Sequence, residues 1–106
     1  MPEGSRLVVV NTTPIIALSL AGELSLLHSL YDEVVVPSAV EAEVLAGGRD
    51  GIGSSELMEA SWLRVASLQD ARRADLLADL DRGEAEVLAL AQELNADLVI
   101  IDERLA

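Results

Sequence analysis

The sequence predicts an α/β fold with a mainly parallel sheet, and three observations carry this prediction. Short apolar, β-branched runs recur along the chain, as expected for strands that are buried on both faces. Helical patterns separate these runs, which is typical of parallel strands joined by helices. The composition is 51% hydrophobic with almost no aromatic residues, so the core is expected to be aliphatic. At 106 residues, the chain is expected to form one domain.

The first expected strand leads directly into a helix. Residues 6–10 ("RLVVV") form the strand, and Asn11 follows at its carboxyl end. Thr12 or Thr13 can cap the helix through its hydroxyl, and Pro14 suits the first helical position. The chain therefore turns from strand to helix at Asn11.

The later elements continue this alternation. Gly47 and Gly48 mark the end of a helix, because glycine readily adopts the left-handed conformation found there. Residues 69–80 and 81–96 are both expected to be amphipathic helices, the second with Asp81 as its cap. The other expected elements are helices over residues 15–21, 23–31, 38–46 and 56–60, and strands over residues 33–37, 62–67 (an edge strand) and 97–102.

The composition also excludes several classes of function. The chain has no cysteine, which excludes disulfides, zinc–thiolate sites and thiol nucleophiles. All 7 basic residues are arginine, which excludes a P-loop ATPase because its phosphate site needs lysine. No signal peptide or membrane-length apolar run is visible, so we expect a cytoplasmic protein that binds no membrane. The net charge of −12 means that an RNA substrate would need bound metal ions or a basic partner to offset repulsion.

Acidic side chains are expected to gather at the carboxyl edge of the sheet. Asn11 and Asp102 each end a strand, and binding sites of open α/β sheets lie beyond this edge. Glu84 falls on the apolar face of the last helix, where a carboxylate needs a cation, a donor or the helix dipole. Glu41 and Glu43 flank the inner face of their helix at similar angles, so the pattern does not choose between them.

Two interpretations of these acids are open at this point. Clusters of oxygen ligands suit Mg²⁺ or Mn²⁺, which activate water and stabilise the charge that develops on a phosphodiester. The simpler alternative is that Glu84 only favours the positive end of its own helix.

Two long stretches carry a recognisable series of motifs. They are "VVVNTTPIIALSLAGELSLLHSLYDEVVVPSAVEAEVLAGG" and "GEAEVLALAQELNADLVIIDERLA". Together they resemble the PIN-domain superfamily and, more narrowly, its DUF3368 branch. This resemblance implies a three-layer α/β/α fold around a parallel sheet with strand order 3-2-1-4-5. The fifth strand and the closing helix have no counterpart in the sequence, so we expect a PIN-like domain over residues 1–106 that is incomplete at its C-terminus.

The resemblance also implies an activity and a set of partners. Many PIN domains are Mg²⁺- or Mn²⁺-dependent ribonucleases, often the toxin of a toxin–antitoxin pair. We therefore expect an RNA substrate and, as protein partners, a small antitoxin or a second copy of the chain. The alternative is a PIN-like module that is catalytically weakened or inactive and binds a partner protein.

The resemblance assigns roles to individual residues. The four acidic positions of the family fall on Asn11, Glu43, Glu84 and Asp102. The metal ligands among them are Glu43, Glu84 and Asp102, with Glu103 as a one-residue alternative to the last. Thr12 or Thr13 matches the small hydroxyl residue of the family and is expected to contact the substrate. Asn11 replaces the usual Asp, and its amide oxygen brings no negative charge, so we expect weaker metal binding.

Overall fold

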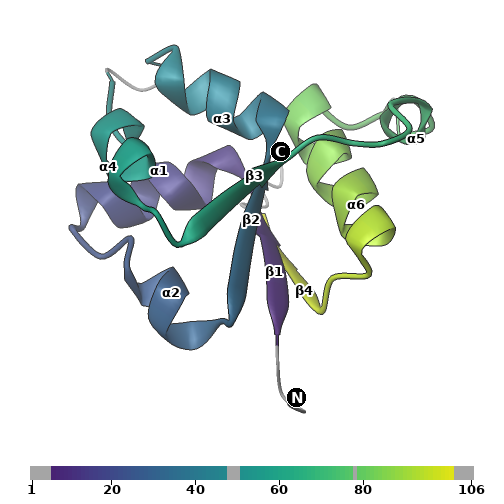
Figure 1. The fold of residues 1–106 in the computed structure, drawn as a ribbon. Helices are drawn as coiled ribbons and strands as arrows, with labels where there is room; N and C mark the ends of the chain where they lie inside the picture. Colours follow the sequence, from purple (N-terminus) through teal and green to yellow (C-terminus); the bar gives the residue numbers. More distant parts are fainter. Residues whose placement is uncertain (1–5, 48–50, 78, 102–106) are drawn as a thin grey trace.

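The computed structural model describes residues 6–47, 51–77 and 79–101. Its centre is a four-stranded sheet in which every pair of neighbouring strands is parallel (Figure 1). The strands are β1 (Leu7–Val10), β2 (Glu33–Pro37), β3 (Leu63–Ala66) and β4 (Leu98–Ile100). Their order is β3-β2-β1-β4, which confirms the order expected for the first four strands of a PIN fold and the edge position of β3.

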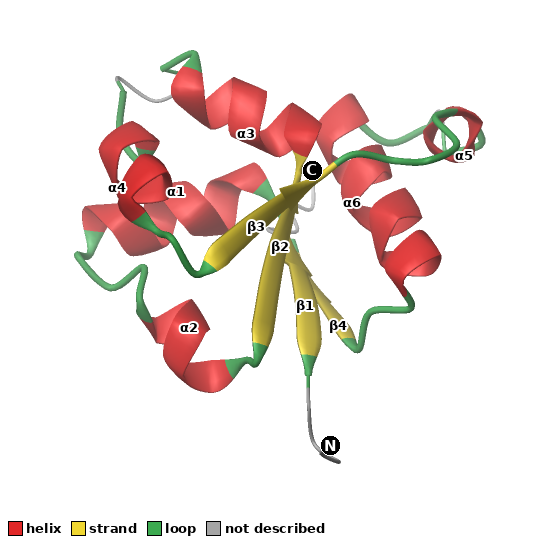
Figure 2. Ribbon diagram, in the orientation of Figure 1, coloured by secondary structure: helices red, strands yellow, loops and turns green. Residues whose placement is uncertain are grey.

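Helices cover both faces of the sheet and its carboxyl edge. They are α1 (Thr12–Leu20), α2 (Leu26–Leu30), α3 (Ser38–Leu45), α4 (Ser54–Glu59), α5 (Arg72–Asp75) and α6 (Arg82–Leu94). Figure 2 shows α1, α2 and α4 on one side of the sheet and α5 and α6 on the other. Helix α3 lies at the carboxyl ends of the strands and contacts α1, α4 and α6. The expected α/β/α layering is therefore confirmed.

The core explains why the strands are continuous apolar runs. The valines of β1 and β2 are at most 1% exposed, because helices cover both of their faces. Each fully buried side chain of this size stabilises the fold by about 1.5–3 kcal/mol. Ile15 of α1 and Leu90 of α6 join the same cluster, so one core ties both helical layers to the sheet.

Helix α1 begins earlier than the sequence predicted. Asn11, whose backbone is extended, occupies the cap position, and Thr12 and Thr13 lie in the first turn. The prediction that Thr12 or Thr13 caps this helix, with Pro14 as its first residue, is therefore wrong. Pro14 is tolerated because first-turn N–H groups have no partner within the helix.

The helix expected over residues 69–80 is much shorter, since only Arg72–Asp75 is helical. A distant carboxylate holds the first residues of this segment, and beyond Asp75 the N–H groups of Leu77 and Leu80 donate to carbonyls only three residues back. Glu93 of α6 accepts hydrogen bonds from the backbone N–H groups of Gln69 (2.8 Å) and Asp70 (3.0 Å). These bonds hold residues 69 and 70 in a loop on the side of α6.

Helix α2 is also shorter than the predicted range of residues 23–31. Glu23 donates its N–H to the carbonyl of Leu18 at 2.8 Å, and Gly22 lies in the left-handed region with φ +71°. This arrangement closes α1 with a Schellman motif and delays the start of α2.

Two further predictions concern the ends of elements and the membrane. The last strand was expected over residues 97–102, and the structure assigns Leu98–Ile100, while residue 102 lies outside the described range. None of the helices in the described ranges has the length and the apolar character needed to traverse a bilayer.

Candidate active site

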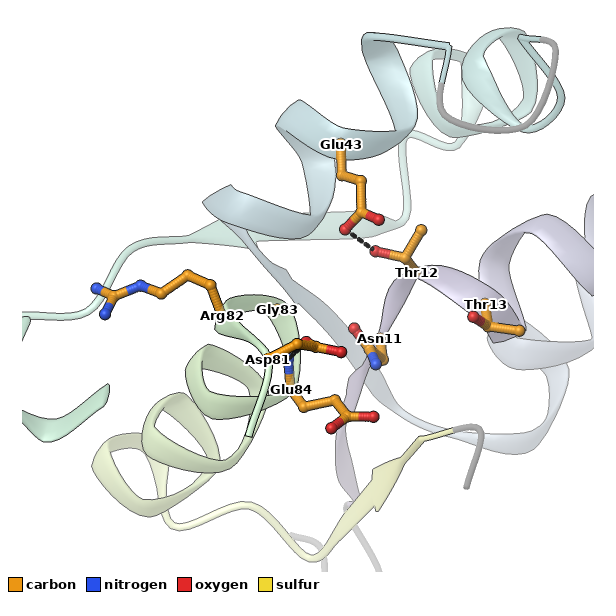
Figure 3. Close-up of a pocket in the computed structure, with 8 residues that line it drawn as sticks. All are labelled: Asn11, Thr12, Thr13, Glu43, Asp81, Arg82, Gly83 and Glu84. Carbon is orange, nitrogen blue, oxygen red and sulfur yellow. Dashed lines mark hydrogen bonds between the residues drawn. The ribbon is translucent and has the colours of Figure 1, made fainter. Parts of the chain in front are cut away.

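A pocket of about 640 Å³ opens at the carboxyl edge of the sheet. Three segments form it: the junction of β1 with α1, the part of α3 at Glu43, and the start of α6 (Figure 3). The lining residues are Asn11, Thr12, Thr13, Glu43, Asp81, Arg82, Gly83 and Glu84. The pocket lies where ligand sites of parallel α/β sheets are found.

Asn11 is held at the floor of this pocket by the sheet. Its backbone N–H donates to the carbonyl of Ile100 at 3.0 Å, which extends the pairing of β1 with β4 by one rung. The residue is only 7% exposed, and its side chain does not cap α1. No hydrogen bond joins this side chain to another residue of the described part of the chain. Among the described residues, the Asn11 amide is not one of the fully enclosed polar groups without a partner, so this side chain is in contact with the pocket space.

A hydrogen bond between α1 and α3 fixes the first acid of the pocket. The hydroxyl of Thr12, itself 7% exposed, donates to Oε1 of Glu43 at 2.9 Å. The bond draws the Glu43 carboxylate toward α1, as Figure 3 shows. Glu43 lines the pocket and Glu41 does not, which resolves geometrically the choice that the helical pattern left open.

The start of α6 contributes two more carboxylates. Asp81 is the N-cap, and its Oδ1 accepts the backbone N–H of Glu84 at 2.9 Å, which confirms the cap predicted from the sequence. The Glu84 carboxylate makes no return bond to the Asp81 backbone within the described residues, so no capping box ties it down. Figure 3 shows it extending toward Asn11. The positive end of the α6 dipole favours both carboxylates at this position.

Gly83 leaves a gap between these groups. An ideal Cβ on Gly83 would lie 3.5 Å from Oδ1 of Asn11, 3.6 Å from Oδ1 of Asp81 and 3.6 Å from Oε1 of Glu43. A single point is therefore close to oxygens from three separate segments. Gly83 does not have a positive φ, so the backbone conformation does not require glycine at this position. The missing side chain keeps open a space that is surrounded by oxygen atoms.

Arg82 lines the same pocket, but its charge is directed elsewhere. Its guanidinium pairs with Asp75 (Nη1 to Oδ1, 3.0 Å) and with Glu86 (Nε to Oε2, 3.2 Å). The hydrogen bond to Asp75 raises the pKa of Arg82 above its ordinary value, with a smaller contribution from Glu86. Figure 3 shows the side chain pointing away from the acids of the pocket. The pocket therefore keeps a negative potential that attracts cations.

The structure brings together most of the residues singled out in the sequence. Asn11, Thr12, Thr13, Glu43 and Glu84 all line the one pocket, whereas Asp102 and Glu103 lie outside the described residues.

Sequence reasoning missed three pocket residues: Asp81, Arg82 and Gly83. Asp81 was interpreted only as a cap. Its spacing of three residues from Glu84, which lies in the first turn of the same helix, was the signal that could have placed it in the pocket.

The donor set fits a hard divalent cation. In the ranges that the structure describes, no group of three or more acidic or histidine side chains is placed to hold a metal ion. However, the amide oxygen of Asn11 and the carboxylate oxygens of Glu43 and Asp81 surround the gap at Gly83. Oxygen donors of this kind favour Mg²⁺ or Mn²⁺ over zinc.

Comparison with known proteins identifies the family. A family model described as DUF3368, a PIN domain, matches residues 7–106. Comparisons with curated proteins and with solved structures give no significant match. The family match covers nearly the whole chain and agrees with the order of its four parallel strands. The chain therefore belongs to the DUF3368 family of PIN domains.

Proposed function

We propose that this PIN domain is a metal-dependent endoribonuclease and the toxin component of a cytoplasmic toxin–antitoxin pair. PIN domains are a nuclease-type family, and this membership supports phosphodiester cleavage as the reaction class. The observation that carries the proposal is the pocket at the carboxyl edge of the sheet. Its oxygen donors come from three segments and converge on the gap at Gly83.

Each residue has a role in this proposal. Glu43, Glu84 and either Asp102 or Glu103 would hold Mg²⁺ or Mn²⁺, and Asn11 would add a neutral oxygen. When bound, the ion would activate water and stabilise the charge that develops on the phosphodiester.

Thr12 and Thr13 have different roles in this proposal. The hydroxyl of Thr12 orients Glu43 through their 2.9 Å hydrogen bond. Thr13 lines the pocket beyond Asn11, where we propose that it contacts the RNA backbone.

Charge has to be compensated for RNA to bind. The chain carries a net charge of −12, and the Arg82 guanidinium is paired with two carboxylates. A bound divalent ion lowers the repulsion at the pocket, and a basic partner protein would lower it further.

The test is cleavage of RNA with Mg²⁺ or Mn²⁺ by the wild type and by matched variants. Glu43→Gln and Glu84→Gln each remove one pocket charge with little change of shape, and both should lower the cleavage rate at least about a hundredfold. Glu41→Gln removes a charge from the same helix as Glu43 but outside the pocket, and should cleave like the wild type. Activity that survives Glu84→Gln or chelation of the metal would reject the assignment.

The neutral residue at position 11 favours a second candidate. A PIN-like module that binds a partner protein without cleaving RNA needs no full set of acids, and Asn11 supplies no charge. Calorimetry separates the two candidates. Heat of Mn²⁺ binding below millimolar concentration supports the nuclease, whereas its absence supports the interaction module.

A further inference from the structure

The start of α6 carries an acid that both caps the helix and lines the pocket. Oδ1 of Asp81 lies 3.6 Å from the Cβ position of Gly83, at the same distance as Oε1 of Glu43. A cap needs only one acceptor oxygen, and Asn or Ser serves at this position about as well as Asp. The Asp81 carboxylate has a second oxygen and further lone pairs that the bond to Glu84 does not use.

An independent observation points to a ligand at this place. Asn11 is 7% exposed, its side chain has no hydrogen bond to the described residues, and Oδ1 lies 3.5 Å from the same Gly83 position. The amide is open to the pocket, where water or a ligand can meet its oxygen. The acceptor of Asn11 and the carboxylate of Asp81 therefore face one space from opposite segments of the chain.

The charges around this space are unequal. Asn11 contributes a dipole and no charge, and Glu43 already accepts the hydroxyl of Thr12. Asp81 sits at the positive end of α6, where a negatively charged side chain is favoured. It is therefore placed to supply the negative charge that the side chain at position 11 lacks.

We propose that Asp81 is a further ligand-binding carboxylate of this pocket and compensates for the neutral side chain of Asn11 when a divalent cation binds. The inference rests on the proposed function, because it concerns the same ion. Gly83 has the complementary role of leaving the space between the two residues open.

The test measures Mn²⁺ affinity by calorimetry, with thermal unfolding of the same samples as the check on folding. Asp81→Asn and Asp81→Ser both keep a capping oxygen and remove the charge, so their melting temperatures should stay close to that of the wild type. Their dissociation constants for Mn²⁺ should rise roughly tenfold to a hundredfold. Asp79 lies two residues before Asp81 in the sequence but does not line the pocket. The control variant Asp79→Asn removes its charge and should bind Mn²⁺ like the wild type.

Moving the negative charge from position 81 to position 11 tests directly whether Asp81 compensates for the neutral Asn11. Asn11→Asp should tighten Mn²⁺ binding, and the double variant Asn11→Asp with Asp81→Asn should return to within a few-fold of the wild type. If the double variant does not regain an Mn²⁺ affinity close to that of the wild type, the proposal that Asp81 compensates for Asn11 is overturned.

The outcomes separate this inference from the proposed function. If Asp81→Asn binds Mn²⁺ like the wild type while Glu84→Gln does not, Asp81 is only a cap and the nuclease proposal stands. If Asp81→Asn and Asp79→Asn weaken binding equally, the effect is one of overall charge and the inference is overturned. A wild type that binds no Mn²⁺ up to millimolar concentration overturns both.

Discussion

The substitution Gly83→Ala should stabilise the protein and at the same time impair its pocket. Alanine in place of glycine inside a helix gains about 0.5–1 kcal/mol. The added methyl group would meet its three nearest oxygens at 3.5–3.6 Å, which is ordinary contact, so no steric cost offsets this gain. For a domain of this size, about 1 kcal/mol corresponds to roughly 4–8 °C in melting temperature. We therefore expect the melting temperature to be unchanged or to rise by a few degrees.

The same methyl group should obstruct ion binding. It would project toward the oxygens of Asn11, Glu43 and Asp81 and would narrow the space beside them that an ion or its water would use. We expect the dissociation constant for Mn²⁺, measured by calorimetry, to rise at least about tenfold.

Gly22→Ala provides the opposite pattern as a control. Nothing lies within 4 Å of its Cβ position, but its φ of +71° strains any residue other than glycine. It should lose about 1 kcal/mol of stability and bind Mn²⁺ normally. The reasoning is refuted if Gly83→Ala lowers the melting temperature by several degrees, or if it binds Mn²⁺ as tightly as the wild type.

Three further substitutions test the fold. Hydrogen bonds from the N–H group of Gln69 and, next in size, that of Asp70 lower the pKa of Glu93. The ionised carboxylate therefore stabilises the fold at pH values above its ordinary pKa. This stabilisation is lost as the pH falls through the lowered pKa. Glu93→Gln should therefore unfold at lower urea concentration at neutral pH and match the wild type at strongly acidic pH; an equal difference at both would contradict the linkage. Ser19→Ala removes a buried hydroxyl that has no partner in the described structure and should gain about 1 kcal/mol in urea unfolding, whereas a loss would reveal a hidden partner. Asn95 caps α6 in the left-handed region at φ 57°, so Asn95→Ala should lose about 1 kcal/mol and Asn95→Gly should not, as measured by thermal melting.

Local patterns were sufficient to predict most of the fold. The apolar runs gave the strands because burial on both faces demands side chains such as Val9 and Val35, which are both 0% exposed. The ends of α1 and α3 follow from Gly22 and Gly47, since both adopt a positive φ. The predicted cap of α6 follows from Asp81, whose side chain bonds to a group only three residues away. In each case the cause lies within a few residues of the effect.

The largest error concerns a segment with a contact that is distant in sequence. The pattern of residues 69–80 is helical, but Glu93 captures two of the N–H groups in this segment from another helix. The side chain of Glu93 is only 10% exposed because the loop covers it. No local pattern could reveal this contact.

In the candidate site, too, some features depend on contacts between residues that are distant in sequence. The family resemblance assigned Glu43, but the physical reason for its orientation is the hydroxyl of Thr12, 31 residues away. The place of Gly83 among three oxygens depends on the packing of α6 against α3 and β1, which a single sequence does not encode in any local pattern.

The position of β1 between β2 and β4 affects when the pocket can be completed during synthesis of the chain. Asn11 is made early, but its backbone N–H binds the carbonyl of Ile100, near the end of the described chain. Translation proceeds at about 5–20 residues per second, so several seconds separate the appearance of these two residues. A nascent chain on the ribosome therefore lacks the floor of its own pocket, and any partner that recognises the earlier strands and helices can engage the chain before the pocket is complete.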